Sequence, residues 1–342
     1  MIHKKWLRIC MACLLLCALV SCRPAKPELG LFLYNEADPY ILEFGRQIIE
    51  VAGASFMVHK FDAANSQPIQ NEQIESWLRA DTGVVIVNPV DRLGAYAVIN
   101  RLRQLDVPVI FFNREPLPAD MALWDEVWYV GAQAAQSGRM QAELVMNLFG
   151  NNPEQLNEYD RNGDGRIQTV LLKGEQGHQD AEIRTAEGLK AFEEKGFVID
   201  VLALEVANWN QAQAYDTIGR VLRDHQDAME LVISNNDAMA LGAINRLRQA
   251  GFFKDNNGNG QVDRADSSWL PVVGIDGLRE AEEAIADGFL YGTVKNDSYS
   301  MAIAIAELAE LIMGTRDSLS VAHTLMDGRY IWIDYLPFVS QQ

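Results

Sequence analysis

Most of the short apolar runs in this sequence are followed by polar or aromatic side chains that could bind a ligand. The candidates are Asp38, Tyr40, Asn113, His178, Asp180, Arg184, Trp209, Asn236, Asp276 and Asn296. Carboxylate, amide and guanidinium groups are planar and can each bind two neighbouring hydroxyl groups. Tyr40 and Trp209 could cover the C–H face of a pyranose ring. An anion would need more cations than this set contains, so the set favours a neutral sugar.

Each of these residues also has an ordinary structural explanation. Aspartate commonly caps a helix N-terminus, and Asp38, Asp180, Asp237 and Asp276 could all do so. A single histidine is usually a surface or hydrogen-bonded residue, and a single tryptophan usually belongs to a core. The recurrence of such residues at nearly every strand end, rather than any one of them, indicates a binding site.

A second kind of chemistry is indicated by the segment from Asp160 to Gln168. Its spacing matches the first nine positions of an EF-hand calcium loop, with oxygen side chains at positions 1, 3, 5 and 9 and glycine at position 6. Position 12 is Leu171, so a glutamate from elsewhere must complete the ligand set if calcium binds. The alternative is a turn without metal. The loop ligands would be Asp160, Asn162, Asp164, the carbonyl of Arg166 and Gln168.

The segment from Asp255 to Asp266 repeats this pattern. It carries fewer carboxylates and ends in aspartate, which predicts weaker calcium binding than at a standard site, and a bare surface loop is the alternative. The candidate ligands are Asp255, Asn257, Asn259, Gln261, Asp263 and Asp266.

These residues are expected to be positioned by alternating strands and helices. Continuous apolar runs predict strands covered on both faces, as in parallel sheets, and the stretches between them have helical length and an amphipathic pattern. Such alternation predicts doubly wound α/β sheets, in which ligands bind beyond the carboxyl ends of the strands. The strand runs are 29–34, 84–87, 107–112, 128–130, 169–172, 198–204, 231–233, 272–274 and 290–294.

Length and charge restrict the classes of function. The chain has 342 residues, which is enough for about two domains. Its 47 acidic and 29 basic residues give a formal charge of −18, which argues against nucleic-acid binding because that requires a basic face.

The N-terminus is predicted to be a targeting segment. Basic residues precede an apolar run at 9–20 that is too short to span a bilayer, which is typical of a secretory signal. The sequence from Leu19 to Cys22 looks like a lipobox, so we expect residues 1–21 to be removed, Cys22 to be lipidated and residues 22–27 to form a tether. A plain signal peptide is the alternative. All four cysteines lie at or before this junction, which excludes a disulfide framework or a thiol catalyst in the mature chain.

The chain resembles the periplasmic galactose/glucose-binding proteins of bacterial ABC importers over about residues 29–339. The most specific segments are Phe111–Pro116, Lys173–Arg184 and Asn235–Met239, with the calcium-like loop just before the second of them. The resemblance implies the periplasmic binding protein type I fold, with three crossovers near Ala132, Asn296 and Ile331. One lobe would comprise residues 28–132 and 296–331, and the other residues 133–295 and 332–342.

The resemblance also implies roles for individual residues. Asp38 would face the sugar 4-hydroxyl and Asn113 a neighbouring one, Asp180 and Arg184 would share the anomeric end, and Tyr40 and Trp209 would sandwich the ring. Glu230 would supply the missing calcium ligand.

Three positions depart from the family pattern. Tyr40 replaces a usual phenylalanine, Arg114 replaces a lysine, and the 255–266 loop looks like an insertion. D-glucose and D-galactose differ in the configuration at one hydroxyl group. Either sugar is a candidate ligand, and we prefer glucose.

The expected mechanism is hinge closure around the sugar. The closed form would be recognised by an ABC permease and ATPase complex, and a chemoreceptor is a further candidate partner. We expect a monomer in the periplasm that is held at the membrane only by its lipid, with structural calcium and no enzymatic activity. The alternatives are a sugar-sensing lipoprotein without transport, a carboxylate-dependent glycosidase, and a repressor, for which no DNA-binding segment precedes the body.

Overall fold

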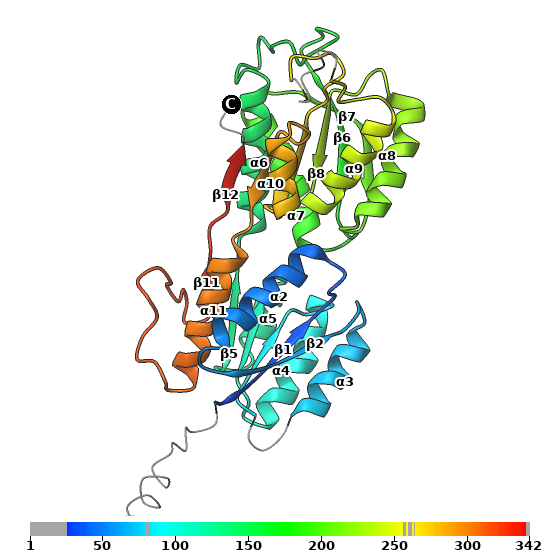
Figure 1. Ribbon diagram of the computed structural model, residues 1–342. Helices are drawn as coiled ribbons and strands as arrows, with labels where there is room; N and C mark the ends of the chain where they lie inside the picture. Colours follow the sequence, from blue (N-terminus) through cyan, green and yellow to red (C-terminus); the bar gives the residue numbers. More distant parts are fainter. Residues whose placement is uncertain (1–25, 79–81, 256–257, 259–261, 263, 340–342) are drawn as a thin grey trace, which may run out of the picture.

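The computed structural model describes residues 26–78, 82–255, 258, 262 and 264–339. The chain forms two lobes, one above the other in Figure 1, and each is built on a six-stranded sheet with helices packed around it. The predicted fold class, two doubly wound α/β lobes, is confirmed. None of the helices in the described part of the chain combines the length and apolarity needed to cross a bilayer.

The sheet of the N-terminal lobe has the strand order β11-β5-β4-β3-β1-β2, and every pair in it is parallel. The central strands are fully buried because apolar side chains on both faces pack under helices, as the continuous apolar runs predict. Its strands are β1 (Glu28–Leu33), β2 (Met57–Asp62), β3 (Val84–Val87), β4 (Val109–Phe112), β5 (Val127–Gly131) and β11 (Tyr330–Trp332). Its helices are α2 (Pro39–Ala52), α3 (Gln67–Trp77), η1 (Arg92–Gly94), α4 (Ala95–Gln104), α5 (Pro118–Met121) and α11 (Ser298–Ile312).

The sheet of the C-terminal lobe has the order β12-β10-β9-β8-β6-β7. Its edge strand β12 runs antiparallel to β10, so this sheet is not wholly parallel. Its strands are β6 (Ile167–Lys173), β7 (Ile199–Val206), β8 (Leu231–Ser234), β9 (Val272–Asp276), β10 (Gly292–Lys295) and β12 (Leu336–Val339). Its helices are α6 (Ala134–Leu148), α7 (Gln179–Glu194), α8 (Gln211–His225), α9 (Asp237–Gln249) and α10 (Arg279–Ala286).

Three segments connect the lobes: they lie between β5 and α6, between β10 and α11, and between β11 and β12. The third connecting segment begins one residue later than the boundary expected at Ile331. Ile331 and Trp332 pair with Val130 and Gly131 of the first sheet, so the chain crosses only after Trp332. The expected tether also ends earlier, because the Pro27 carbonyl accepts a hydrogen bond from the Met57 amide of the first lobe.

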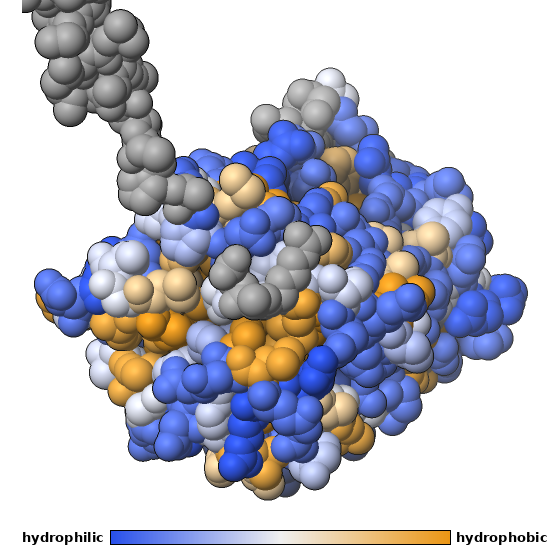
Figure 2. Space-filling model, turned by 90° about the horizontal axis from the view of Figure 1, so that it is seen from below, coloured by the Kyte–Doolittle hydropathy of each residue, from blue (hydrophilic) through white to orange (hydrophobic). Residues whose placement is uncertain are grey.

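The surface at the free end of the N-terminal lobe is mainly hydrophilic (Figure 2), with apolar side chains in small patches between polar ones. Exposed apolar side chains of this lobe, such as those of Met57 and Leu105, are scattered over different elements. Single exposed apolar residues of this kind are common on folded proteins and do not by themselves mark a binding site.

Candidate functional site

All ten candidate ligand residues line one cavity between the two lobes, at the carboxyl ends of both sheets. Two further side chains share it, those of Tyr34 and Arg114. The free space between these side chains is about 350 Å³, part of which is open to solvent. The sequence analysis noted Arg114 only as a departure from the family pattern. It did not single out Tyr34, which ends an apolar run and there looks like a core residue.

In the first lobe, Asp38 both caps a helix and faces the cavity. Its Oδ1 atom accepts hydrogen bonds from the backbone amides of Tyr40 (2.9 Å) and Ile41 (3.4 Å) at the start of α2. Its Oδ2 atom accepts a hydrogen bond from the Tyr34 hydroxyl. Burial raises the pKa of the Asp38 carboxyl, and these hydrogen bonds oppose the shift. The same side chain therefore caps α2 and lines the cavity.

The turn after β4 brings two more side chains to the cavity. Asn113 lies at a φ of 61°, a left-handed conformation that asparagine tolerates better than most residues. Its carbonyl accepts a hydrogen bond of 3.0 Å from the Tyr129 hydroxyl, which fixes the turn. The Arg114 guanidinium lies 3.8 Å from the centroid of the Tyr34 ring and is only 6% exposed. This stacking holds the Arg114 cation at the wall of the cavity.

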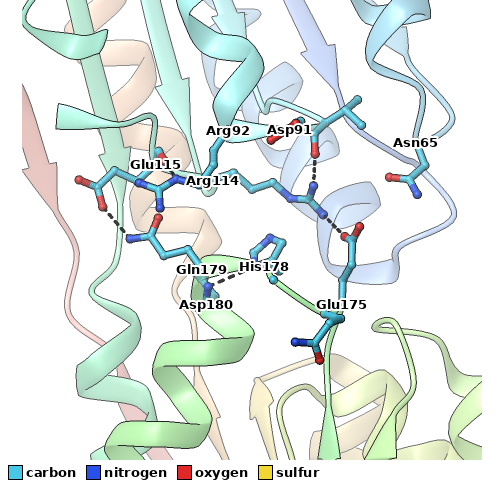
Figure 3. A pocket seen from close by; sticks show the side chains of 12 residues that line it. Asn65, Asp91, Arg92, Arg114, Glu115, Glu175, His178, Gln179 and Asp180 are labelled. Carbon is cyan, nitrogen blue, oxygen red and sulfur yellow. Dashed lines mark hydrogen bonds and ion pairs between the residues drawn. The ribbon is translucent and has the colours of Figure 1, made fainter. Parts of the chain in front are cut away.

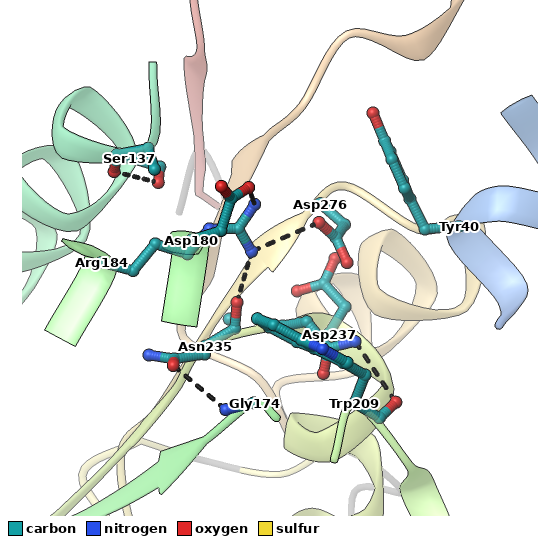
Figure 4. A network of polar contacts seen from close by, with 12 residues as sticks. Tyr40, Ser137, Gly174, Asp180, Arg184, Trp209, Asn235, Asp237 and Asp276 are labelled. Atoms are coloured by element: carbon teal, nitrogen blue, oxygen red, sulfur yellow. Dashed lines mark hydrogen bonds and ion pairs between the residues drawn. The ribbon is translucent and has the colours of Figure 1, made fainter. Parts of the chain in front are cut away.

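Arg184 is the central cation of the second lobe (Figure 4) and is 5% exposed. It donates hydrogen bonds to the Asn235 carbonyl (2.7 Å) and to the Tyr335 hydroxyl (3.1 Å). Its guanidinium nitrogens lie 3.6 Å from Asp180 and 3.9 Å from Asp276. One buried cation thus faces two carboxylates that also line the cavity.

The ionisation of these carboxylates is not determined by Arg184 alone. A neighbouring cation normally keeps a carboxylate ionised, which would argue against an acid–base enzyme. Burial instead raises the pKa of Asp180 and of Asp276, although the charge of Arg184 opposes both shifts. Loss of hydration inside the protein outweighs the attraction of the cation. This electrostatic reason against a glycosidase therefore does not hold.

His178 and Trp209 form a wall of the cavity in the second lobe. His178 caps α7 by accepting a hydrogen bond of 3.1 Å at Nδ1 from the Asp180 amide, which leaves Nε2 to carry the proton of the neutral ring. Burial lowers the pKa of His178 well below its usual value and so favours that neutral form. The His178 ring meets the Trp209 ring edge-on at 5.1 Å.

A glycine makes the position of the Trp209 ring possible. A Cβ atom on Gly174 would lie 2.2 Å from the Trp209 indole, so only glycine leaves room for the ring at this place. Trp209 itself has a φ of 61°.

Asp237 is a positioning residue that the sequence analysis treated only as a helix cap. The cap of α9 is Asn236, whose Oδ1 accepts a hydrogen bond from the Met239 amide. The fully buried Asp237 carboxylate instead accepts hydrogen bonds from the Gly277 amide (2.7 Å), the Leu278 amide (2.9 Å) and the Thr293 hydroxyl (2.7 Å). The first two fix the turn in which Asp276 has a φ of 127°. No local sequence signal reveals this role, because the donors lie 40 or more residues later in the chain.

Several polar atoms at the cavity are buried without a hydrogen-bond partner among the described residues. They are Tyr40 Oη, Arg114 Nε, Arg184 Nε, Trp209 Nε1 and Asn296 Oδ1. Buried polar groups in folded proteins nearly always have partners, so a concentration of exceptions needs an explanation. These atoms come from both lobes and from the crossover that follows β10, and a ligand with many hydroxyl groups could satisfy them together.

The calcium-like loop folds as a series of tight turns next to β6. The Asp160 carboxylate accepts hydrogen bonds from the Gly163 and Gly165 amides, at 2.9 and 3.0 Å. Glu230 is the residue before β8 and accepts hydrogen bonds from the Arg161 amide (2.7 Å) and the Gln168 amide (3.3 Å). Its carboxylate therefore lies against the loop.

Oxygen donors of this loop fit a hard cation. Gln168 is 4% exposed, and its Oε1 atom is buried without a partner among the described residues. The described chain holds no group of three His, Cys, Asp or Glu side chains suited to a metal. The three carboxylates among the expected calcium ligands, those of Asp160, Asp164 and Glu230, therefore do not converge on one point in the described chain, and the amide and backbone oxygens are the part of the set that suits calcium.

Two expected sites fall partly or wholly outside the described residues. In the second calcium-like loop, Asn257, Asn259, Gln261 and Asp263 lie outside the described residues, and so does Cys22.

Comparison with known proteins gives consistent results over nearly the whole chain. A sequence profile of the family described as periplasmic binding protein domain matches residues 29–316. The D-galactose/methyl-galactoside binding periplasmic protein of Haemophilus influenzae is 30% identical over 317 residues, which cover 91% of this chain and 89% of that protein.

Solved structures share the fold at lower identity. An ABC transporter solute binding protein from Bacillus halodurans with bound myo-inositol has a TM-score of 0.73 and 23% identity, and the match covers 93% of this chain and 96% of that one. A periplasmic solute binding protein from Actinobacillus succinogenes with bound D-allose has a TM-score of 0.74 and 20% identity, covering 93% and 99%.

Proposed function

This chain belongs to the periplasmic binding protein family, and on that premise we propose that it binds a neutral hexose between its lobes and delivers it to an ABC importer. The observation that carries the proposal is the set of unpartnered polar atoms from both lobes around one cavity. Donors and acceptors arranged in this way suit a ligand that has a hydroxyl group on most of its carbons. The aromatic rings of Tyr40 and Trp209 would cover its C–H faces.

D-glucose or D-galactose is the proposed hexose, with glucose preferred. The galactose-binding relative supports this choice at 30% identity. The Asp38 carboxylate supports it as well, because a carboxylate accepts a hydrogen bond from either epimer of a hydroxyl beside it.

Closure of the hinge would couple binding to recognition by the importer. A sugar that contacts Asp38 and Asn113 in one lobe and Asp180 and Arg184 in the other binds the closed arrangement better than the open one. Sugar binding therefore shifts the population of protein molecules toward the closed form. A permease and ATPase complex can distinguish this form from the open one. A chemoreceptor could recognise the same form.

We further propose that the protein acts as a monomer in the periplasm, held at a membrane by lipid on Cys22. A sugar-sensing lipoprotein without transport remains the alternative. The acidic charge of the chain, −18, does not favour adsorption to anionic lipid, so a lipid anchor would be needed to hold it there.

Native mass spectrometry tests the proposal and separates a receptor from a glycosidase. The protein is first freed of co-purified ligand by reversible unfolding and then incubated with D-glucose, D-galactose, D-xylose, D-allose and myo-inositol in turn. We expect one molecule of glucose or galactose per chain, recovered chemically unchanged. Absence of any sugar adduct on folded protein contradicts the proposal, and hydrolysis of an added aryl glycoside by the same sample would favour the enzyme.

Calcium is proposed as a structural ion of the second lobe. Asp160, Asn162, Asp164, the Arg166 carbonyl, Gln168 and Glu230 would hold it, and calcium binding would draw their oxygen atoms together around the ion. The unpartnered Oε1 of Gln168 supports this assignment. The loop from 255 to 266 is proposed as a second, weaker site on its sequence alone.

Calcium is expected to raise the melting temperature of the protein by several degrees relative to EDTA. An ion that binds only the folded state adds about 2.7 kcal/mol at a hundredfold excess over its Kd. The Glu230→Gln variant should lose most of this gain, whereas Glu158→Gln, at an exposed carboxylate two residues before the loop, should keep it. Differential scanning calorimetry checks this, and equal melting temperatures of the wild type in calcium and EDTA would contradict it.

Gly174→Ala is expected to weaken sugar binding about tenfold or more, because the new Cβ atom would displace the Trp209 ring from the cavity wall. Gly219→Ala is the matched control, since its Cβ atom would meet only the movable side chain of Arg246. Titration of tryptophan fluorescence with the bound sugar measures both affinities. Unchanged affinity in Gly174→Ala would show that the position of the Trp209 ring does not matter for binding.

A further inference from the structure

The hydrogen bonds that hold Arg184 at the cavity come from two distant parts of the chain. The Asn235 carbonyl accepts one of them at 2.7 Å, and Asn235 directly follows β8 in the second lobe. The Tyr335 hydroxyl accepts the other at 3.1 Å, and Tyr335 lies between β11 and β12, in the third segment that connects the lobes. A side chain that lines the cavity is therefore tied directly to a connection between the lobes.

The Tyr335 side chain is itself held by packing. It is 2% exposed and lies in a small apolar cluster with Leu144, Ile275 and Val294. Burial raises the pKa of its hydroxyl, so the phenol keeps its proton and remains a neutral hydrogen-bond partner of Arg184. A phenylalanine could fill the same apolar space, so what the tyrosine adds at this position is its hydrogen bond.

Tyr335 is also joined to the first connecting segment. Its backbone amide donates a hydrogen bond of 3.0 Å to Oε1 of Gln136 near the start of α6, and Nε2 of Gln136 donates one of 3.1 Å to the Asp334 carboxylate. The Ile333 amide donates one of 2.8 Å to the carbonyl of Gly131, which ends β5. The first and third connecting segments are thus bound to each other on both sides of the first one.

Without the Tyr335 hydroxyl, the Arg184 guanidinium would have competing partners. The carboxylates of Asp180 and Asp276 lie 3.6 and 3.9 Å from its nitrogens, which is longer than a charge-assisted hydrogen bond. Attraction between charges is strong where water is excluded, so a guanidinium released from Tyr335 would move toward one of these carboxylates. That movement would change a cation and a carboxylate at the cavity wall together.

The two lobes are in contact while this link is made. On the side of the cavity shown in Figure 3, Arg114 of the first lobe lies 3.6 Å from Glu175 of the second, and Gln179 of the second lobe donates a hydrogen bond of 3.2 Å to Glu115 of the first. The link between Arg184 and Tyr335 therefore exists in an arrangement in which both lobes can contact one ligand.

We propose that Tyr335 is a positioning residue for sugar binding. Its hydroxyl holds the Arg184 guanidinium in the orientation that binds the sugar, and Gln136 fixes Tyr335 to the connecting segments. The proposal rests on hexose binding in the cavity. A change in the connecting segments would move Tyr335 and Arg184 with it, so the affinity of the cavity depends on how the lobes are joined.

Calorimetric titration of Tyr335→Phe with D-glucose and D-galactose tests this. The change removes the hydroxyl and keeps the ring in its apolar cluster, so we expect hexose affinity to fall about tenfold. Tyr291→Phe is the matched control, because Tyr291 packs against the same cluster and is not among the described residues that line the cavity. Its hexose affinity should change less than about twofold. Equal affinity in Tyr335→Phe and wild type would overturn the inference.

The NMR signal of the Arg184 side chain separates positioning from general damage. In protein labelled with isotopically enriched arginine, the Nε–H signal of Arg184 is assigned by its absence in Arg184→Lys. Tyr335→Phe should shift or broaden this signal, and Tyr291→Phe should leave it in place. Weakened affinity together with an unmoved Arg184 signal would overturn the inference.

A second variant tests the link to the connecting segments. Gln136→Ala removes the acceptor of the Tyr335 amide and should weaken hexose binding about threefold or more. Unchanged affinity in this variant would overturn the role given to the connecting segments. If folded wild-type protein binds no hexose, the proposed function itself is rejected, whereas the NMR comparison still shows whether Tyr335 holds Arg184.

Discussion

Replacing Arg184 by methionine is expected to abolish measurable sugar binding and to destabilise the second lobe. The guanidinium is 5% exposed, donates to Asn235 and Tyr335 and faces two carboxylates. Truncating one member of a buried charged cluster typically costs about 2–5 kcal/mol in binding, a loss of about 30-fold to several thousandfold. The free energy of unfolding should fall by about 1–3 kcal/mol, because the buried Asn235 carbonyl loses its hydrogen-bond donor.

The Arg139→Met variant is the matched control for Arg184→Met. Arg139 belongs to the same lobe and pairs with Glu187 (2.6 Å) and Glu194 (2.8 Å), but the three side chains are partly or largely exposed. Exposed pairs contribute about 0–1 kcal/mol, so neither affinity nor stability should change much. Denaturant unfolding and calorimetry measure the two effects. An Arg184→Met protein that binds sugar as tightly as Arg139→Met would contradict the role given to Arg184.

The second large effect is expected from Asp237→Ala. This change leaves the Gly277 and Leu278 amides and the Thr293 hydroxyl without their acceptor. A buried donor without a partner costs about 1–3 kcal/mol, so the free energy of unfolding should fall by about 3 kcal/mol or more. Sugar affinity should fall as well, because the turn that presents Asp276 is no longer held.

A companion variant separates positioning from general damage. Thr293→Val removes one donor and leaves both backbone amides paired with Asp237, so it should lower stability less and keep most of the sugar affinity. Denaturant unfolding and calorimetric titration of both variants check this. If Thr293→Val loses as much affinity as Asp237→Ala, the two backbone hydrogen bonds do not position Asp276.

The pH dependence of stability gives a further readout of Asp237. Burial raises its pKa above the ordinary value of 3.8, so the folded protein binds this proton more tightly than the unfolded chain. Binding of this proton therefore stabilises the folded state fully at pH values below the ordinary pKa of 3.8. This stabilisation is lost as the pH rises from 3.8 through the raised pKa of the folded protein. Asp237→Asn should flatten this part of the stability curve measured by urea unfolding. An identical slope in wild type and Asp237→Asn would contradict the assignment.

The continuous apolar runs predicted the doubly wound parallel sheets, and the family resemblance predicted their division into two lobes. Val84–Val87 is such a run, and all four residues are fully buried in β3. The edge strand β2 was missed because polar residues interrupt its sequence, MVHKFD, and the strand is only partly buried. The edge strand β12 was also missed, since its four residues are all exposed and its place in the sheet is set by pairing with β10.

The candidate site was accessible to sequence reasoning because the carboxyl ends of parallel strands converge in space. Every predicted ligand residue follows an apolar run, which is why all ten meet at one cavity. The role of Asp237 and the raised pKa values of Asp180 and Asp276 could not be predicted in this way. They depend on which backbone amides from other parts of the chain lie close in space and on how completely water is excluded. Residue type and spacing predict neither of these.

Isothermal titration calorimetry of the wild-type protein with D-glucose and D-galactose, after removal of co-purified sugar, tests hexose binding most directly. We expect saturable binding of one molecule per chain for at least one of the two sugars. Heat of dilution only, from protein shown by circular dichroism to be folded, would contradict the claim that the cavity between the lobes is a hexose site.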